Sequence, residues 1–219
     1  MSETATRGRG RPRQEIGEEA LLDAALHTFA AEGFRGARVE LVAERAGVTK
    51  PLLFRRFRSK DGLFEWTIDR EIAVLTERLF TAYDRVEGTR LADALHAGAE
   101  AIISYATARP DGFRLLFQVG DVGATAQPGV SEKVRAVLTD RMEDIVARRL
   151  AQGAIGGAGP LSGGLLAAAI VGASEHVARR CVEDPRVDPA AAARLLAGML
   201  TRGLRDLSPA EVRAADRLR

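Results

Sequence analysis

The sequence predicts an all-α protein with about nine helices, and three observations support this fold class. Alanine and leucine dominate the composition, whereas aromatic residues make up only 5% of it, a balance that favours helices over strands. Apolar residues recur along the chain at the three- and four-residue spacing of an amphipathic helix. Neither the alternating pattern of a strand nor an internal repeat is present in the 219 residues.

The beginning of the chain reads as an arm followed by a helix. Residues 1–14, MSETATRGRGRPRQ, are polar and contain glycine and proline but almost no apolar side chain, which predicts a disordered arm. From Glu15 the apolar residues take up helical spacing. Gly33 is the predicted C-terminal stop of this first helix.

Two short helices are expected next. The second helix covers about residues 39–46 and ends before Gly47, and the third covers about 49–57. Thr49 is the candidate N-cap of the third helix. Pro51 falls in its first turn, where a missing backbone N–H group costs little.

A larger helical region occupies the rest of the chain. Ser59 is expected to cap a long fourth helix that ends near Val86, and the Gly-rich residues 153–164 are expected to form a flexible connection. Further helices are predicted over about 91–108, 112–119, 130–151, 165–182 and 189–207. The expected organisation is an arm (1–14), a first domain (15–60), a second domain (61–207) and a C-terminal tail (208–219).

Positive charge is concentrated in the first 60 residues, although the net charge of the chain is only +2. Residues 1–14 contain four arginines and one glutamate, and residues 35–60 contain eight basic residues and two acids. Between them, residues 15–34 contain five acids and no base. A localised basic region suits the phosphates of a nucleic acid. The alternative is two solvated basic faces.

The segment GVTKPLLFRRFRSK is both apolar and strongly basic. On a helix, Leu53 and Phe57 share one face and are expected to pack against the two preceding helices. The basic side chains project from the other faces: Lys50, Arg55 and Arg56. Two short helices joined by a turn, with the second strongly basic, predict a helix-turn-helix whose second helix enters the DNA major groove.

The sequence contains no motif for catalysis or metal binding. His27, His96 and His176 are scattered, without partners at metal-ligand spacing. We interpret Cys181 as a buried structural thiol. The stretch PLSGG lacks the first glycine of a nucleophile elbow. The chain is therefore predicted not to be an enzyme and to need no cofactor and no metal.

The sequence also predicts a cytoplasmic protein that does not cross a membrane. A single cysteine suits a reducing compartment, and no apolar stretch follows the N-terminal arginines as it would in a signal peptide. The longest uncharged apolar stretch, residues 161–174, is 14 residues long. This is too short to span a bilayer.

Residues 15–64 resemble the DNA-binding domain of the TetR family of bacterial repressors. The matching stretches are ALLDAALHTFAAEGF, VELVAERAGV and TKPLLFRRFRSKDGLF. The family pattern runs Gly-Val-Ser/Thr, then Leu-Tyr, then Phe, Ser-Lys and Leu-Phe. It is met here by Gly47, Val48, Thr49, Leu53, Phe57, Ser59, Lys60, Leu63 and Phe64.

The resemblance implies a homodimeric, sequence-specific transcriptional regulator, a repressor that a small molecule releases from a palindromic double-stranded operator. It also implies that the C-terminal helical domain binds the ligand and forms the dimer. The alternative function is a non-specific architectural DNA-binding protein, whose affinity would fall with salt equally for all sequences. A third alternative is an enzyme that carries a basic helical domain.

Four departures from the family pattern predict an altered operator sequence. Phe54 replaces the usual tyrosine, Leu52 a frequent threonine or serine, and Arg56 a frequent histidine or tyrosine. Arg38 stands where a threonine usually caps the second helix. The residues expected to read bases are Lys50, Pro51, Leu52, Arg55 and Arg56, while Thr49, Phe54, Lys60 and Arg38 are expected to contact or position the DNA backbone.

The arm contains Arg-Gly-Arg-Pro, which resembles an AT-hook. Arg9 and Arg11 are expected to enter a narrow A·T minor groove, which small glycines allow the backbone to approach. The alternative is a solvated tail.

Two further sites are expected in the C-terminal domain. The candidate walls of a ligand pocket are Tyr83, His96, Tyr105, Phe113, Phe117 and Gln118. The alternative is that these side chains simply fill the core. An apolar ligand is favoured by the abundance of Ala, Leu and Val. The last two helices are expected to form the dimer interface through Gly164, Ala168, Gly172, Leu196, Met199 and Leu200, unless this surface packs internally.

Overall fold

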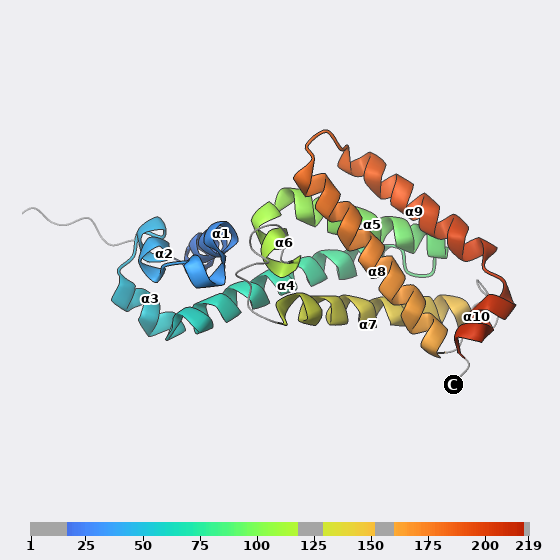
Figure 1. Cartoon of the computed structure of the whole chain (residues 1–219), viewed down its shortest axis with the longest axis horizontal. Helices are drawn as coiled ribbons and strands as arrows, with labels where there is room; N and C mark the ends of the chain where they lie inside the picture. The colour runs from blue at the N-terminus through green and yellow to red at the C-terminus, as the bar shows by residue number, and fades with distance from the viewer. Residues whose placement is uncertain (1–16, 118–128, 152–159, 217–219) are drawn as a thin grey trace, which may run out of the picture.

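The computed structural model describes residues 17–117, 129–151 and 160–216. Within these ranges the chain forms ten α-helices and no strand, so the predicted all-α class is confirmed with one helix more than expected (Figure 1). The helices are α1 (Glu18–Gly36), α2 (Val39–Arg45), α3 (Lys50–Phe57), α4 (Lys60–Arg85), α5 (Leu91–Ala108), α6 (Pro110–Phe117), α7 (Val130–Ala151), α8 (Pro160–Glu183), α9 (Pro189–Asp206) and α10 (Pro209–Ala215).

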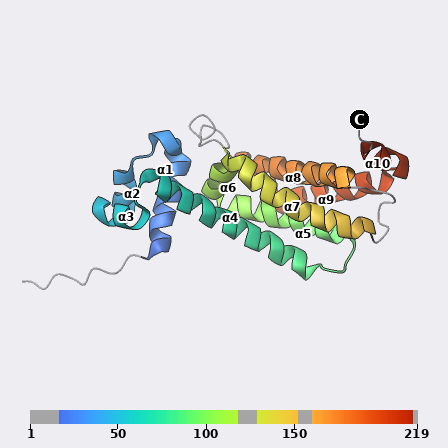
Figure 2. The same cartoon turned by 90° about the horizontal axis from the view of Figure 1, so that it is seen from below.

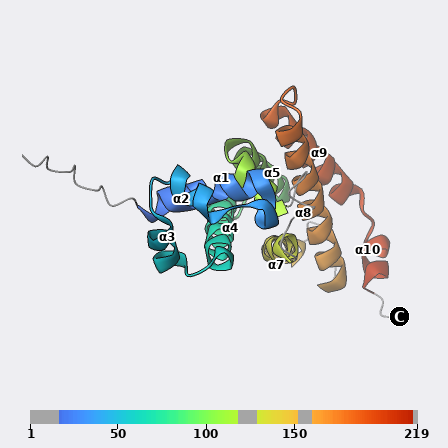
Figure 3. The ribbon, with the colours of Figure 1, turned by 60° about the vertical axis from the view of Figure 1, so that its left-hand side comes forward.

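The molecule is elongated, with α1, α2 and α3 gathered at one end and the other helices forming a bundle. The long helix α4 leads from α3 into the bundle, where it runs beside α7 (Figures 1 and 2). Helix α5 packs against α4, α8 and α9. Figure 3 shows α8 and α9 on the side of the bundle that faces away from α1–α3.

Helix α1 continues past its predicted end at Gly33. Gly33 has a φ of 67° and a ψ of 169°, which interrupt the helix, but one more turn follows to Gly36. The extra turn is held because the Phe34 ring packs edge-on against the ring of Phe64 at 4.9 Å, and Phe29 contacts the same ring at 5.0 Å. These aromatic contacts fasten α1 to the start of α4.

Helix α4 begins as the sequence predicts. The Ser59 hydroxyl accepts a hydrogen bond from the Gly62 amide at 3.0 Å, so Ser59 is confirmed as the N-cap. The helix then runs without a break for 26 residues. It contacts α1 as well as α5, α6 and α7, and therefore belongs to the packing of both ends of the molecule.

Two expectations about the C-terminal region are wrong. The predicted connection 153–164 extends too far, because α8 already begins at Pro160. Its first turn is stabilised by the Asp216 carboxylate, which accepts hydrogen bonds from the Ser162 amide at 2.9 Å and hydroxyl at 2.7 Å. Residues 152–159 of that connection lie outside the described part of the chain.

The predicted tail 208–219 contains the additional helix α10. Ser208 and Glu211 form a capping box, in which the Ser208 hydroxyl accepts from the Glu211 amide and the Glu211 carboxylate accepts from the Ser208 amide. Pro209 occupies the first helical turn, as is typical of helix starts. Both signals are present in the sequence SPAE, but seven residues were too few to show an apolar repeat.

Helix α8 is longer and more apolar than the sequence analysis anticipated. Residues Leu161–Glu183 are long and apolar enough to cross a membrane by length and composition, with a mean hydropathy of 1.3. The same helix contains Glu175, a buried carboxylate that accepts two hydrogen bonds from Arg135 of α7. A buried ion pair and close packing against α5, α7 and α9 are typical of the core helix of a globular protein.

Candidate nucleic-acid interface and ligand cavity

A tight turn joins α2 to α3. Gly47 has a φ of 67°, a conformation that favours glycine. Its amide donates to the Glu44 carbonyl at 3.0 Å, and the Val48 amide donates to the Ala43 carbonyl at 2.9 Å. These bonds close the end of α2 and direct the chain into α3, which gives the predicted helix-turn-helix.

Helix α3 separates its apolar from its basic residues as predicted. The side chains of Leu53 and Phe57 are buried, and α3 packs against α2 and α4, so their role as anchors is confirmed. Exposed positions of the helix are occupied by Lys50, Pro51, Leu52, Arg55 and Arg56. Phe54 is half-buried and lies 5.5 Å below the Lys50 ammonium.

The adjacent residues Leu52 and Leu53 provide a matched test of this arrangement. Leu53 is 0% exposed, whereas Leu52 is 39% exposed. We expect Leu53→Ala to lower the free energy of unfolding by about 2–5 kcal/mol, because it leaves a cavity beneath α3. Leu52→Ala is expected to change stability by less than about 0.5 kcal/mol. Denaturant unfolding followed by circular dichroism measures both, and equal losses would contradict the assignment of Leu53 as the anchor.

Two of the basic residues on α3 have acidic partners that the sequence analysis did not identify. Lys50 donates to the Glu40 carboxylate of α2, and this hydrogen bond lowers the pKa of Glu40. Arg56 forms an ion pair with Glu18 at the start of α1. Both pairs are exposed to solvent, where ion pairs are weak, so a DNA phosphate can compete for either cation.

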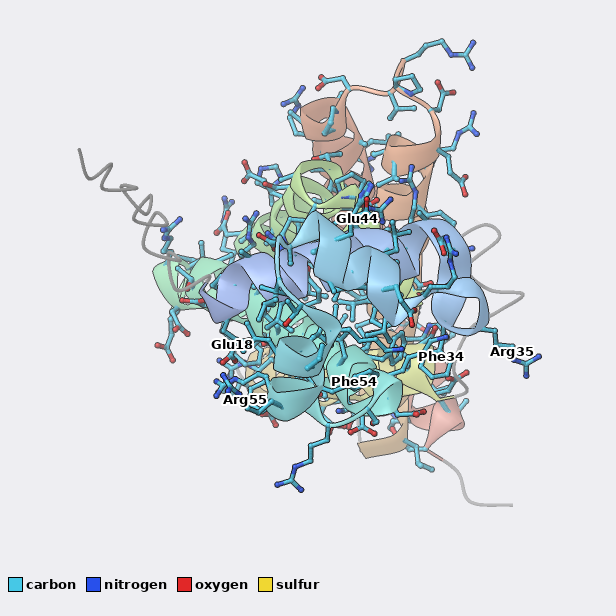
Figure 4. The ribbon with its side chains drawn as sticks, turned by 90° about the vertical axis from the view of Figure 1, so that its left-hand side faces the viewer. Glu18, Phe34, Arg35, Glu44, Phe54 and Arg55 are labelled. Carbon is cyan, nitrogen blue, oxygen red and sulfur yellow. The ribbon has the colours of Figure 1, made fainter. Side chains whose placement is uncertain are left out.

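Arg55 is an exposed cation that makes no hydrogen bond or ion pair with any described residue. Figure 4 views this end of the molecule directly and places Arg55 and Glu18 on one side, with Phe34 and Arg35 on the other. Lys60 lies against that second side, where its ammonium donates to the Arg35 carbonyl at 3.2 Å and faces the Phe34 ring at 5.0 Å. Lys60 therefore also fastens α4 to the end of α1.

The remaining predicted DNA contacts lie at helix starts or in the arm. Arg38 and Thr49 occupy the N-cap positions of α2 and α3, but neither side chain bonds a backbone amide of its helix. Thr49 is therefore the N-cap by position alone, and both side chains are exposed. Arg9 and Arg11 lie outside the described residues.

Arg45 and Trp66 have roles that the sequence analysis did not assign. Arg45 belongs to the basic region but donates to the hydroxyl of buried Thr28 at 2.8 Å, and so holds α2 on α1. Trp66 is 50% exposed and lies beside α3, with its ring 6.1 Å from that of Phe57 and 5.9 Å from the Arg56 guanidinium. The available signal was a lone tryptophan at a solvent-facing position of the α4 pattern.

A small apolar cavity lies inside the bundle between α4, α5, α7 and α8. Its volume is about 30 Å³, room for roughly one water molecule. Tyr83, Arg141 and Ser174 supply its polar groups. Burial raises the pKa of Tyr83 to about 12, so its hydroxyl remains a donor. A Cβ atom at Gly98 would lie 2.4 Å from that hydroxyl, which explains a glycine within α5.

Of the predicted pocket residues that the structure describes, only Tyr83 lines this cavity. Tyr105, Phe113 and Phe117 are instead fully buried core residues, because large apolar rings pack wherever helices converge. The rings of Phe113 and Phe117 lie 4.7 Å apart, centroid to centroid, and are tilted by 39°. His96 is exposed and lines an open groove between α4 and α5. Gln118 lies outside the described residues.

Comparison with known proteins identifies the family. The family model for bacterial regulatory proteins of the tetR family matches residues 21–66, which include the whole helix-turn-helix. The transcriptional activator FasR of Mycolicibacterium smegmatis is 30% identical over 145 residues, 65% of this chain and 64% of FasR. A TetR-like regulator from Rhodococcus sp. RHA1 superimposes over 90% of this chain and 100% of its own with a TM-score of 0.68 and 27% identity. The chain belongs to the TetR family.

The match to FasR leaves more than a third of that protein uncovered, since it spans 64% of its length. Structural similarity to known proteins covers more of the chain than sequence similarity does. FadR of Bacillus subtilis, solved in complex with stearoyl-CoA, covers 85% of this TetR chain and 99% of its own with a TM-score of 0.71 at 17% identity. That likeness concerns the fold alone.

The predicted dimer face of this TetR protein is only partly available at its surface. Ala168 and Met199 are exposed, and Gly172 and Leu200 are partly exposed. The inclusion of Leu196 is wrong, because its side chain is 2% exposed and packs inside the protomer. Gly164 faces α7, where its Cβ position lies 3.0 Å from Glu143. Other exposed apolar side chains on α8 and α9 are Leu161, Leu165 and Leu195.

Proposed function

We propose that this protein is a sequence-specific DNA-binding transcriptional regulator that inserts α3 into the major groove of a palindromic operator. The observation that carries the proposal is the division of α3, in which buried Leu53 fixes the helix while Arg55 and Arg56 remain exposed. Arginine donates two hydrogen bonds to guanine O6 and N7. Exposed Leu52 offers an apolar contact for a thymine methyl group.

Competition between DNA sequences tests this function against the architectural alternative. A labelled operator fragment is displaced by unlabelled operator or by random duplex DNA at several salt concentrations. A regulator binds its operator more tightly than random DNA by a factor of about 10³ or more. Equal displacement by both DNAs at every salt concentration would instead establish the non-specific architectural protein.

We further propose that the regulator acts as a homodimer in the cytoplasm. The support is the exposed apolar surface on α8 and α9, centred on Ala168, Leu195 and Met199. Several large exposed apolar side chains on two packed helices are typical of an interface. Two copies related by a two-fold axis would present two α3 helices to the two halves of a palindrome.

The ligand that we propose is an apolar molecule with one polar or anionic group. The cavity between α4 and α8 has mainly apolar walls, with Tyr83 and Arg141 among its few polar groups. At about 30 Å³ it must widen to admit a ligand. FadR, which shares the fold, binds stearoyl-CoA, and this molecule is a suitable probe. Native mass spectrometry of protein from its own cell identifies the bound metabolite, and an operator-driven reporter shows whether the ligand relieves repression, as we propose.

The arm is expected to add affinity and an A·T preference beside the operator. Residues 1–13 contain four arginines, which can release counterions from the DNA. Deleting residues 1–13 should weaken operator binding and flatten the dependence of log K on log salt, as measured by fluorescence anisotropy. If the affinity and the slope stay unchanged, the arm is a solvated tail.

A further inference from the structure

The region where α1 meets the bundle contains a buried carboxylate, Glu71 of α4. Its side chain is 0% exposed. It accepts hydrogen bonds from the Tyr105 hydroxyl at 3.0 Å and from Arg109 through Nε at 3.0 Å and Nη2 at 2.6 Å. Burial alone would raise the pKa of Glu71, but the bonds from Arg109 and the nearby Arg70 lower it below its usual value, so the group stays charged.

Arg70 links the Glu71 carboxylate to acidic side chains of α1. One terminal nitrogen donates to Glu71 at 3.1 Å, while the other lies 2.9 Å from the Asp23 carboxylate and 3.3 Å from that of Glu19. Arg109 also reaches towards Asp23, at 4.0 Å. One buried carboxylate and two arginines therefore connect α4 and the end of α5 to the first helix of the DNA-binding end.

Helix α6 is fitted closely against the same cluster. A Cβ atom at Gly112 would lie 2.3 Å from a Glu71 oxygen and 2.6 Å from the Tyr105 hydroxyl, so only glycine leaves room for the carboxylate here. Asp111, the residue before Gly112 in α6, accepts a hydrogen bond from Nδ1 of His27 of α1 at 2.9 Å. Charged contacts thus join α1 to α4, to the end of α5 and to α6.

A charged cluster restricts the relative geometry of the packed helices more tightly than an apolar contact does. Apolar surfaces tolerate sliding and repacking, whereas a bidentate arginine–carboxylate pair holds one geometry. The helices that supply the cluster also wall the cavity: α4 through Leu79 and Tyr83, and α5 through Ile102, which lies one turn before Tyr105. A movement of α4 against α5 at the cavity would therefore displace Glu71 relative to Tyr105 and Arg109.

We propose that Glu71 is the positioning residue of the DNA-binding end: through Arg70 and Arg109 it fixes α1, and with it α2 and α3, in one orientation relative to the cavity. This inference rests on the proposed function in so far as that orientation sets the fit of α3 to an operator. The orientation itself is a property of the protein alone.

The test measures orientation and operator binding separately. Spin labels on Glu44→Cys in α2 and Asp144→Cys in α7, in a Cys181→Ala background, report the distance between the two ends by pulsed electron paramagnetic resonance. A large excess of unlabelled chain ensures that any dimer carries one labelled protomer. The variants are Asp23→Asn, which alters only an exposed partner, and Tyr105→Phe, which removes one bond to Glu71. The control is Glu32→Gln, because Glu32 lies on α1 without a bond to any described residue.

The parent and the control should give one narrow distance distribution. Asp23→Asn and Tyr105→Phe should broaden it and weaken operator binding by roughly tenfold, a typical size for coupling between sites, while circular dichroism shows the same helix content. Distributions as narrow as that of the control would overturn the proposal, and so would broadening without any loss of operator affinity. Failure of the parent protein to prefer operator DNA, with these distributions as expected, would remove the proposed function but leave the orienting role of Glu71 intact.

Discussion

Replacing Ala168 or Met199 with arginine is expected to yield a monomer that no longer binds operator DNA. Both residues are exposed on the α8–α9 face. In an interface with two-fold symmetry each substitution occurs twice, so two guanidinium groups would have to be buried at positions that now carry small or apolar side chains. Operator binding should fall with dimerisation, because a monomer can occupy only one half-site at a time.

Light scattering after size exclusion measures the mass, and fluorescence anisotropy measures operator affinity. Ala73→Arg is the matched control, since Ala73 is exposed on α4, outside the α8–α9 face. It should remain a dimer with unchanged affinity. If both Ala168→Arg and Met199→Arg remain dimeric, the interface lies on another surface.

Arg55 and Arg56 are each to be replaced with alanine. If the replaced arginine reads a base, the protein is expected to lose its preference for that base at one operator position. A bidentate arginine–guanine pair contributes about 1–3 kcal/mol of discrimination. Arg56 must leave Glu18 to reach a base, whereas Arg55 has no partner among the described residues. Arg55 is also free to lie along the DNA backbone, so the two substitutions need not give the same result.

A panel of single-base operator variants separates the two roles. An arginine that reads a base loses discrimination at one position, whereas one that contacts a phosphate loses affinity evenly and reduces the salt slope by about one. Arg35→Ala is the control, because Arg35 is exposed on the opposite side of this end from Arg55 (Figure 4). If neither substitution on α3 relaxes any position, specificity comes from DNA shape.

Local patterns were sufficient to predict the helix-turn-helix. The spacing of Leu53 and Phe57 places them on one face whatever surrounds the helix, and Ser59 caps α4 through an amide only three residues away. Local patterns could not predict which acidic residue each arginine would pair with. Arg56 meets Glu18, and Arg109 meets Glu71, across 38 residues of sequence in each case. Only the tertiary arrangement of α1 relative to α3, and of α5 relative to α4, brings these charges together.

The ligand cavity and the dimer face were harder to predict for a related reason. Helical spacing identifies the apolar residues of α9, but it does not show whether each one packs inside the protomer or lies on the exposed face. Leu196 therefore looked equivalent to Met199 in the sequence, although one is buried and the other exposed. Tyr83 and Tyr105 are both mainly buried aromatic residues, yet Tyr83 borders the cavity whereas the Tyr105 hydroxyl is bonded to Glu71, and the sequence pattern does not distinguish the two environments.

Selection from a random pool of duplex DNA tests most directly the claim that this TetR protein reads sequence. The purified full-length protein is incubated with the pool, bound DNA is amplified over several rounds, and the enriched fragments are sequenced. We predict one palindromic motif with at least one G·C pair in each half-site, which is lost when Arg55 and Arg56 are both replaced by alanine. Recovery of unenriched, random sequence at every salt concentration would contradict the account.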